Sequence, residues 1–270
     1  MSLQGRSIAA PAVPGAGQMA IDSWMLDQLV THGQAPMLRF YGWSAVAVSL
    51  GYHQRQWPEP WAHLTWQGQP VELVRRPTGG RAVLHQGDLT YAIALPISGN
   101  RQAAYQTICE ALIAAWRQFD VPLHYGTAGS SYRHQANCFA LATSADLVTD
   151  DGYKLIGSAQ LRRDRYVLQH GSIRLWPNLD LARQVFGHPP IAEPTPPTAI
   201  PEQPSDEFLM QLQAVIQQEL TKRLQVAFTP QPLSDQELAA IAERSTAFAI
   251  PASSSPKRAA LTPADIPPRL

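Results

Sequence analysis

The sequence is poor in cysteine and lacks long apolar segments. Its 270 residues include only two cysteines, Cys109 and Cys138, which are too few for a disulfide framework and have no metal-ligand spacing. No apolar run approaches the ~20 residues that cross a bilayer. Residues 1–17 lack the charged start and apolar stretch of a secretory signal. We therefore expect a cytoplasmic protein with neither a metal site nor a membrane partner.

An excess of charge of either sign is also missing. The 21 basic and 21 acidic residues cancel, and nucleic acids and anionic membranes favour proteins with surplus lysine and arginine. Nucleic acid is therefore not expected as a partner. Lysine itself is rare, with only Lys154, Lys222 and Lys257. Because lysine is more easily deprotonated than arginine and differently hydrated, Lys154 is a candidate functional residue.

Helical and extended segments mix without a strict βαβ rhythm, which predicts an α+β fold. Apolar spacing predicts helices over 19–32, 105–119 and 208–224, and a capping box predicts another from Ser234. Strands are predicted at 38–41, 45–50, 71–76 and 89–95, with a hairpin at 154–161 and 166–175. We expect one catalytic domain over 18–245, whose proline-rich connector 189–204 lacks core residues and leads to C-terminal helices. Residues 1–17 are expected to be flexible, 126–137 to form a loop, and 246–270 to be disordered.

The densest candidate motif is RRPTGGRAVLH at residues 75–85. Gly79 and Gly80 after a strand let the backbone approach a ligand closely and present its N–H groups. Arg75 and Arg76 add fixed positive charge for a carboxylate or phosphate. Taken alone, such a pattern occurs more often in an ordinary turn. No GxxxxGK[ST] phosphate loop is present.

A second candidate motif is a strand that Lys154 opens. Gly157, Ser158 and Ala159 interrupt this strand with small residues, which is typical of close approach by a ligand or another backbone. The alternative is that Lys154 is a solvated charge at a strand end and that His170 is a hydrogen-bonded core histidine.

Cys138 follows the polar loop and is a candidate nucleophile. A thiol at a loop edge near a cation can have a lowered pKa and react as a thiolate. The alternative is a small buried apolar residue, and this alternative is preferred for Cys109, which lies within a predicted helix. His85 is a candidate base for Cys138.

Together these segments resemble the biotin/lipoate protein ligase family, which includes lipoate ligases and octanoyltransferases. The resembling stretches are MAIDSWML (19–26), LRFYGW (38–43), SLGYHQ (49–54), RRPTGGRAVLH (75–85), and KLIGSAQLRR with LQHGSI (154–173). The resemblance implies that family's catalytic-domain fold, with mixed β-sheets packed against helices. It also implies an acyl pocket and a lysine, Lys154, that contacts the acyl carbonyl. The implied substrate-binding residues are Arg75, Arg76, Thr78, Gly79, Gly80, His85, Gly157, Ser158, Ala159, Gln160, His170 and Gly171.

The pair Cys138-Phe139 is similar to a branch of octanoyltransferases that hold the acyl group as a thioester on this cysteine. That similarity implies transfer of an octanoyl or lipoyl group from acyl carrier protein, through Cys138, to a lysine of a lipoyl-domain protein such as glycine cleavage H protein. No cofactor is needed on this route. The branch usually continues with an acidic residue and a proline, whereas residues 140–142 here are Ala-Leu-Ala.

Two alternatives stay open. In an ATP-dependent lipoate–protein ligase, Lys154 would bind an acyl-adenylate, ATP and Mg²⁺ would be required, and Cys138 would be incidental. In a non-catalytic acyl- or biotin-binding relative, the pocket would remain without turnover.

Overall fold

Segments from both ends of the chain meet in an eight-stranded sheet. A computed structural model describes residues 3–9, 11–126, 146–187 and 194–251. The strand order is β13 (Val226–Pro230), β1 (Leu3–Ile8), β2 (Met37–Tyr41), β8 (Asp88–Pro96), β12 (Tyr166–Arg174), β11 (Lys154–Arg163), β10 (Asp146–Val148) and β9 (His124–Tyr125). Strand β1 runs parallel to both of its neighbours, and the other pairings are antiparallel.

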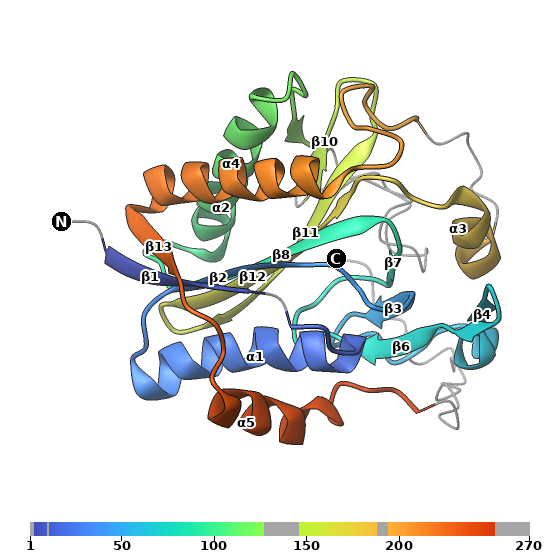
Figure 1. Cartoon of the computed structure of the whole chain (residues 1–270), viewed down its shortest axis with the longest axis horizontal. Helices are drawn as coiled ribbons and strands as arrows, with labels where there is room; N and C mark the ends of the chain where they lie inside the picture. Colours follow the sequence, from blue (N-terminus) through green and yellow to red (C-terminus); the bar gives the residue numbers. More distant parts are fainter. Residues whose placement is uncertain (1–2, 10, 127–145, 188–193, 252–270) are drawn as a thin grey trace, which may run out of the picture.

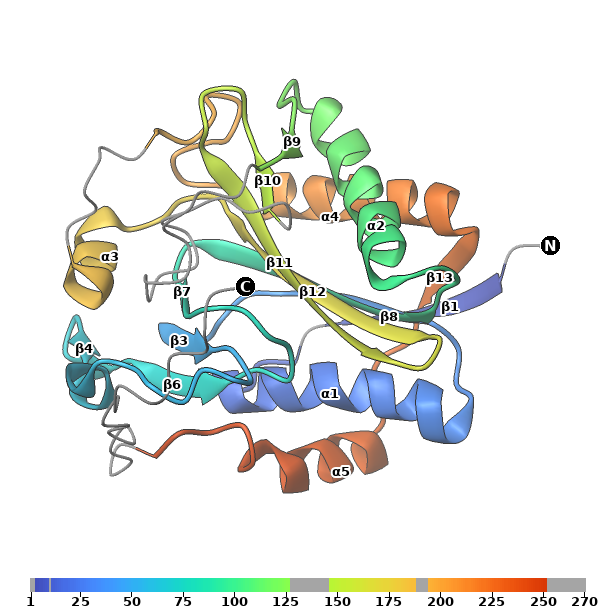
Figure 2. The same ribbon diagram turned by 180° about the vertical axis from the view of Figure 1, so that it is seen from behind.

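Two pairs of helices cover the two faces of this sheet (Figures 1 and 2). Helices α2 (Arg101–Arg117) and α4 (Asp206–Leu224) lie on one face, and α1 (Gly15–His32) and α5 (Asp235–Ser245) lie on the other. Side chains alternate between the faces along a strand. In β8, accordingly, Tyr91 and Ile93 pack in the α2/α4 core, whereas Ala92 and Ala94 pack in the α1/α5 core.

A smaller sheet lies beside the large one and carries its own core. Its order is β6 (Glu72–Arg75), β3 (Ala47–Leu50) and β7 (Val83–His85). The 3₁₀ turn η1 (Glu59–His63), the short hairpin β4 (Thr65–Trp66) and β5 (Gln69–Pro70), and helix α3 (Leu179–Phe186) complete the described fold. In the described part of the chain, every helix is too short or too polar to span a bilayer.

Local sequence patterns are confirmed for the helices and for one hairpin. The predicted helices correspond to α1, α2 and α4, and Ser234 forms the predicted capping box with Glu237 at the start of α5. Strands β11 and β12 form the predicted hairpin, which turns at Asp164 with a positive φ of 53°.

The prediction that residues 1–17 are flexible is wrong for most of this segment. Strand β1 is inserted between β13 and β2, and α1 already begins at Gly15. Gly5 permits the close pairing with β13, because a Cβ at this position would lie 2.6 Å from the Val226 side chain. The partner strand is distant in sequence, so local composition carried no sign of the pairing.

The predictions for the connector and the tail are also wrong in part. Within the connector, Ile200 is buried in the α2/α4 core. At the start of the predicted disordered tail, Ala249 bridges Val74, and the N–H of Ile250 donates to the carbonyl of Leu73. Backbone pairing with β6 therefore holds this segment, up to the last described residue of the tail. Residues 188–193 and 252–270 lie outside the described residues.

Candidate active site

A cavity of about 720 Å³ lies where the two sheets and helix α2 meet. Its walls come from segments that are far apart in sequence: Met19 on α1, Ser49 on β3, His85 on β7, Tyr105 on α2 and His170 on β12. Its lining combines apolar and aromatic residues such as Met19 and Trp43 with polar ones such as Ser49, His85 and Asp146. Concave sites with convergent polar groups are typical of small-molecule binding.

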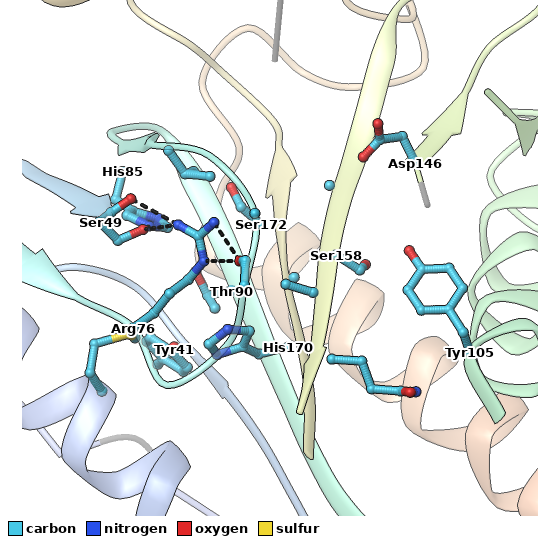
Figure 3. Close-up of a pocket in the computed structure, with 18 of the residues that line it drawn as sticks. Tyr41, Ser49, Arg76, His85, Thr90, Tyr105, Asp146, Ser158, His170 and Ser172 are labelled. Carbon is cyan, nitrogen blue, oxygen red and sulfur yellow. Dashed lines mark hydrogen bonds between the residues drawn. The ribbon is translucent and has the colours of Figure 1, made fainter. Parts of the chain in front are cut away.

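The small residues of β11 lie between two sides of this cavity. In Figure 3, Arg76, His85 and His170 lie on one side of the strand, and Tyr105 and Asp146 lie on the other. Within the described residues, β10 pairs with β11 only as far as Gly157, so the cavity reaches around the strand beyond this point. Gly157, Ser158 and Ala159 have small side chains, which leave room for the cavity along this part of β11.

Arg76 holds the loop that contains Gly79 and Gly80 in place. Its buried guanidinium donates to the backbone carbonyl of Ser49 at 2.8 Å (Figure 3). It also donates to the backbone carbonyls of Gly79 at 2.8 and 3.1 Å and of Arg81 at 2.6 Å. A buried guanidinium needs such acceptors, because an unpaired one is costly. The positive φ of 95° at Gly80 suits glycine.

Arg75 acts on the neighbouring turn in a similar way. Its Nη1 donates to the carbonyls of Gly51 at 3.0 Å and of Gln54 at 2.7 Å, and its guanidinium lies 5.8 Å from the ring centroid of Trp57. Sequence reasoning assigned both arginines to an anionic ligand. In the structure, Nη1 of Arg75 and the guanidinium of Arg76 donate to backbone carbonyls, and Arg76 but not Arg75 is among the residues that line the cavity. A role for either arginine in binding an anionic ligand stays a prediction.

His85 is the centre of a buried hydrogen-bonded chain. Its Nδ1 lies 2.9 Å from Asp88 Oδ2, and its Nε2 lies 2.8 Å from Ser49 Oγ. The ring stacks on Trp43 with centroids 3.8 Å apart. Burial lowers the pKa of His85, and the nearby Asp88 carboxylate offsets this only in part. A neutral ring therefore donates from Nδ1 to Asp88 and accepts the Ser49 hydroxyl proton at Nε2.

His170 forms a second chain of the same kind. Its Nδ1 lies 2.6 Å from Asp22 Oδ2, and its Nε2 lies 2.6 Å from Thr78 Oγ1. Asp22 also accepts a hydrogen bond from Tyr41 Oη at 2.9 Å. The two hydrogen-bonded chains hold the loop of Gly79 and Gly80 from both sides. In the first chain, Ser49 Oγ accepts a hydrogen bond from Arg76 Nη1, and in the second, Thr78 directly precedes Gly79. The alternative of a hydrogen-bonded core histidine matches the burial and the partners of His170, and the ring also lines the cavity. Its role in binding substrate stays a prediction.

Lys154 is buried rather than solvated. Only 4% of this residue is exposed, and its Nζ lies 2.9 Å from Oδ1 of Asp146, which lines the cavity. The alternative of a solvated strand-end charge is thus wrong. Sequence reasoning missed Asp146, because strand pairing across an irregular register between β10 and β11 brings the two residues together.

A polar network lies on the α2 side of β11. Ser158 Oγ lies 2.8 Å from Tyr91 Oη, and Gln169 Nε2 donates to Tyr91 Oη at 3.0 Å and to Cys109 Sγ at 3.7 Å. Burial raises the pKa of Cys109 to about 12, so this thiol is not a nucleophile at neutral pH. The prediction of a buried, inert Cys109 is confirmed.

Most of the predicted substrate-binding residues line one cavity. Those that line it are Arg76, Gly79, Gly80, His85, Gly157, Ser158, Ala159, Gln160, His170 and Gly171. Thr78 and Lys154 lie behind the lining and contact it through His170 and Asp146. Cys138 lies outside the described residues. Among the residues that are described, no three His, Cys, Asp or Glu side chains are grouped to hold a metal ion.

The sequence profile of the lipoyl protein ligase A/B catalytic domain matches residues 14–223. The chain belongs to this family. It is 38% identical over 172 residues to an octanoyltransferase LipM of Carboxydothermus hydrogenoformans, a match that covers 62% of this chain and 63% of that protein. An octanoyltransferase LipM of Symbiobacterium thermophilum is 37% identical over 175 residues, or 60% of this chain and 62% of the relative. The chain thus spans less than two thirds of the length of these curated relatives.

Solved structures show the same architecture. A putative lipoate protein ligase, Ta0514 from T. acidophilum with bound lipoic acid, superposes with a TM-score of 0.69 at 19% identity. The match covers 90% of this chain and 94% of that one. At this identity the likeness concerns the fold, and it confirms the predicted catalytic-domain fold of the biotin/lipoate protein ligase family.

Proposed function

We propose that this chain is an octanoyltransferase that moves an octanoyl or lipoyl group from acyl carrier protein to a lysine of a lipoyl-domain protein, such as glycine cleavage H protein. The observation that carries the proposal is the 38% identity with a protein named octanoyltransferase LipM. The cavity supports it: Met19, Trp43 and Tyr105 give apolar surface for an acyl chain, and a buried ammonium lies behind one wall.

The first half-reaction would load the enzyme. The Cys138 thiolate attacks the carbonyl carbon of the carrier thioester, the new carbon–sulfur bond forms, and the carrier leaves as its thiol. One thioester replaces another, so the exchange is nearly balanced in energy and needs no ATP or other cofactor. In the second half-reaction, an amine of the lipoyl-domain protein attacks the acyl-enzyme, an amide forms and the Cys138 thiol is released.

Lys154 would stabilise the negative oxygen that develops in both steps. Its ammonium is buried and hydrogen-bonded to Asp146, and the carboxylate offsets the cost of burying a positive charge. A fixed donor in a site that excludes water stabilises a developing oxyanion strongly. Removal of one such donor typically costs about 3 kcal/mol, or two to three decades in rate.

The acyl chain would lie along the small residues of the cavity. Gly79, Gly80, Gly157 and Ala159 line it, and a bulkier side chain at any of these positions would shorten the space for the chain. His85 would present a neutral ring to the acyl group, because burial lowers its pKa, and the His170 ring would be held in place by its hydrogen bonds to Asp22 and Thr78.

The proposal is tested by an acyl-transfer assay with a purified lipoyl domain. Octanoyl acyl carrier protein, supplied without ATP, should give the octanoylated domain. Product formed only from free octanoate or lipoate with ATP and Mg²⁺ would instead identify an ATP-dependent ligase. Binding of an acyl compound without product under either condition would identify a non-catalytic relative.

A further inference from the structure

The chain segment after helix α5 pairs with the outer edge of the small sheet. Residues 246–251 leave α5 and run alongside β6 (Figures 1 and 2), and we call them the C-terminal strap. Three backbone contacts join the strap to β6: a bridge between Ala249 and Val74, a hydrogen bond of 2.8 Å from the N–H of Arg75 to the carbonyl of Phe248, and one of 2.9 Å from the N–H of Ile250 to the carbonyl of Leu73. The strap lies beyond residues 14–223, where the chain matches the family's catalytic domain.

Two side chains of the strap are anchored in different hydrophobic cores. Phe248 packs against the core between the large sheet and α1/α5, and Ile250 packs against the core of the small sheet. Helix α5, which leads into the strap, is itself held by the ion pair between Arg6 and Glu237, with an N–O distance of 2.7 Å. A shift of the strap along β6 would therefore break contacts in both cores.

The strap bonds β6 at the residue where the cavity wall begins. The N–H of Arg75 donates to the strap, and the next N–H, that of Arg76, donates to the carbonyl of Leu50 on β3 at 3.0 Å. The backbone is thus held from both edges at this point. The side chains of the same two arginines hold the turn at 51–54 and the loop of Gly79 and Gly80, here called the glycine loop, which lines the cavity. A displacement of β6 here would move both side chains and, through them, the cavity wall.

Loss of the strap pairing would affect position more than stability. A backbone N–H or C=O at a sheet edge can bond to water instead, so the net contribution of such a hydrogen bond to stability is modest. Water does not fix the place of a strand, whereas the strap ties β6 to two cores. A misplacement of about 1 Å at a substrate-positioning wall can lower the rate about 10²-fold.

We propose, on the basis of the proposed function, that the C-terminal strap positions the glycine loop for binding of the acyl group. The backbone N–H of Ile250 and the carbonyl of Phe248 are the positioning groups, and they act through β6 and Arg75. Neither strap residue lines the cavity, so their effect on the acyl group is indirect. A segment outside the family match thereby becomes part of what shapes the site.

The test compares two substitutions at one position of the full chain. Ile250→Pro removes the N–H that donates to Leu73, whereas Ile250→Ala keeps this N–H and loses most of the same apolar side chain. A difference between the two variants therefore reports on backbone pairing rather than on packing. Hydrogen–deuterium exchange, measured by mass spectrometry on peptides that cover residues 75–81, should be faster in Ile250→Pro than in Ile250→Ala.

Octanoyl transfer to a lipoyl domain should separate the two variants in the same direction. For octanoyl acyl carrier protein, kcat/KM should be about 10- to 10²-fold lower in Ile250→Pro than in Ile250→Ala. The loss should appear in KM, because a displaced wall weakens binding of the substrate and of the transition state alike. Equal exchange or equal kcat/KM in the two variants would overturn the proposal. A loss confined to kcat would also overturn it, since a smaller folded fraction alone would give that result.

A measurement on the wild-type chain covers the case in which Ile250→Pro does not fold. Coupling between two sites is reciprocal, so a ligand that binds against the glycine loop should stabilise the pairing of the strap. Octanoyl acyl carrier protein should therefore slow hydrogen exchange in the peptide that covers the strap, and unchanged exchange there would overturn the proposal. If the wild type forms no acyl-enzyme and no product, the proposed function itself fails. That result is distinct, because exchange in Ile250→Pro and Ile250→Ala still tests whether the strap holds the glycine loop.

Discussion

Replacement of Gly51 by alanine should displace the glycine loop of the cavity. A Cβ at position 51 would lie 1.9 Å from the carbonyl oxygen of Gly80, and 3.0 Å is the closest approach that such atoms tolerate. Backbone must therefore move by about 1.1 Å, which disturbs the hydrogen bonds from Arg76 to Gly79 and Arg81. Overpacking of this kind typically costs about 1–3 kcal/mol of unfolding free energy. A displacement of about 1 Å at a substrate-positioning wall can lower the rate about 10²-fold.

The assays for Gly51→Ala are urea unfolding and octanoyl transfer to a lipoyl domain. Gly42→Ala is the matched control, because no heavy atom lies within 4 Å of its added Cβ, and it should match the wild type in both assays. If Gly51→Ala also matched the wild type in stability and rate, the tight contact between Gly51 and the glycine loop would not hold that wall in place.

Three further predictions concern buried charge. Lys154→Met should lower the unfolding free energy by about 3–5 kcal/mol, because it removes the cation of the buried Lys154–Asp146 ion pair, and adding Asp146→Asn should restore most of it. Additive effects in the double variant would contradict the buried pair. Because the folded state lowers the pKa of His85, stability should fall as the pH drops below about 6.5, and His85→Gln should show a smaller fall in pH-dependent unfolding. The hydrogen bond from Arg6 lowers the pKa of Glu237 to about 2. The charged Glu237 side chain therefore stabilises the folded state fully above about pH 4.3, and this contribution is lost as the pH falls toward 2. In acid unfolding, Glu237→Gln should lack this part of the pH dependence.

Local patterns allowed most of the fold to be predicted. Helices α2 and α4 have an apolar stripe, and the β11–β12 hairpin has two strands joined by a short charged turn, so neighbouring residues carry the signal. The pairing of β1 with β13 could not be found in this way, because it depends on two segments at opposite ends of the chain. The same holds for Ala249 and Ile250, whose backbone pairing with β6 overrides a disorder-prone composition.

The candidate site could be predicted only where residue type or family resemblance marked it. The rarity of lysine and the small residues after it pointed to Lys154 and its strand. The hydrogen-bond and ion-pair partners of these residues lie on other elements and follow no local pattern, so only the structure could reveal them. Lys154 pairs with Asp146, His85 with Ser49, and His170 with Asp22. For Arg76, the sequence pattern suggested an anionic ligand but did not reveal the hydrogen bonds that its buried guanidinium donates to backbone carbonyls.

Intact-mass spectrometry after incubation with octanoyl acyl carrier protein in the absence of ATP tests the proposed function most directly. The wild-type chain should gain one octanoyl group and lose it when a lipoyl domain is added. Cys138→Ala should gain none and should transfer none. An octanoylated lipoyl domain formed at the wild-type rate by Cys138→Ala would contradict the covalent mechanism.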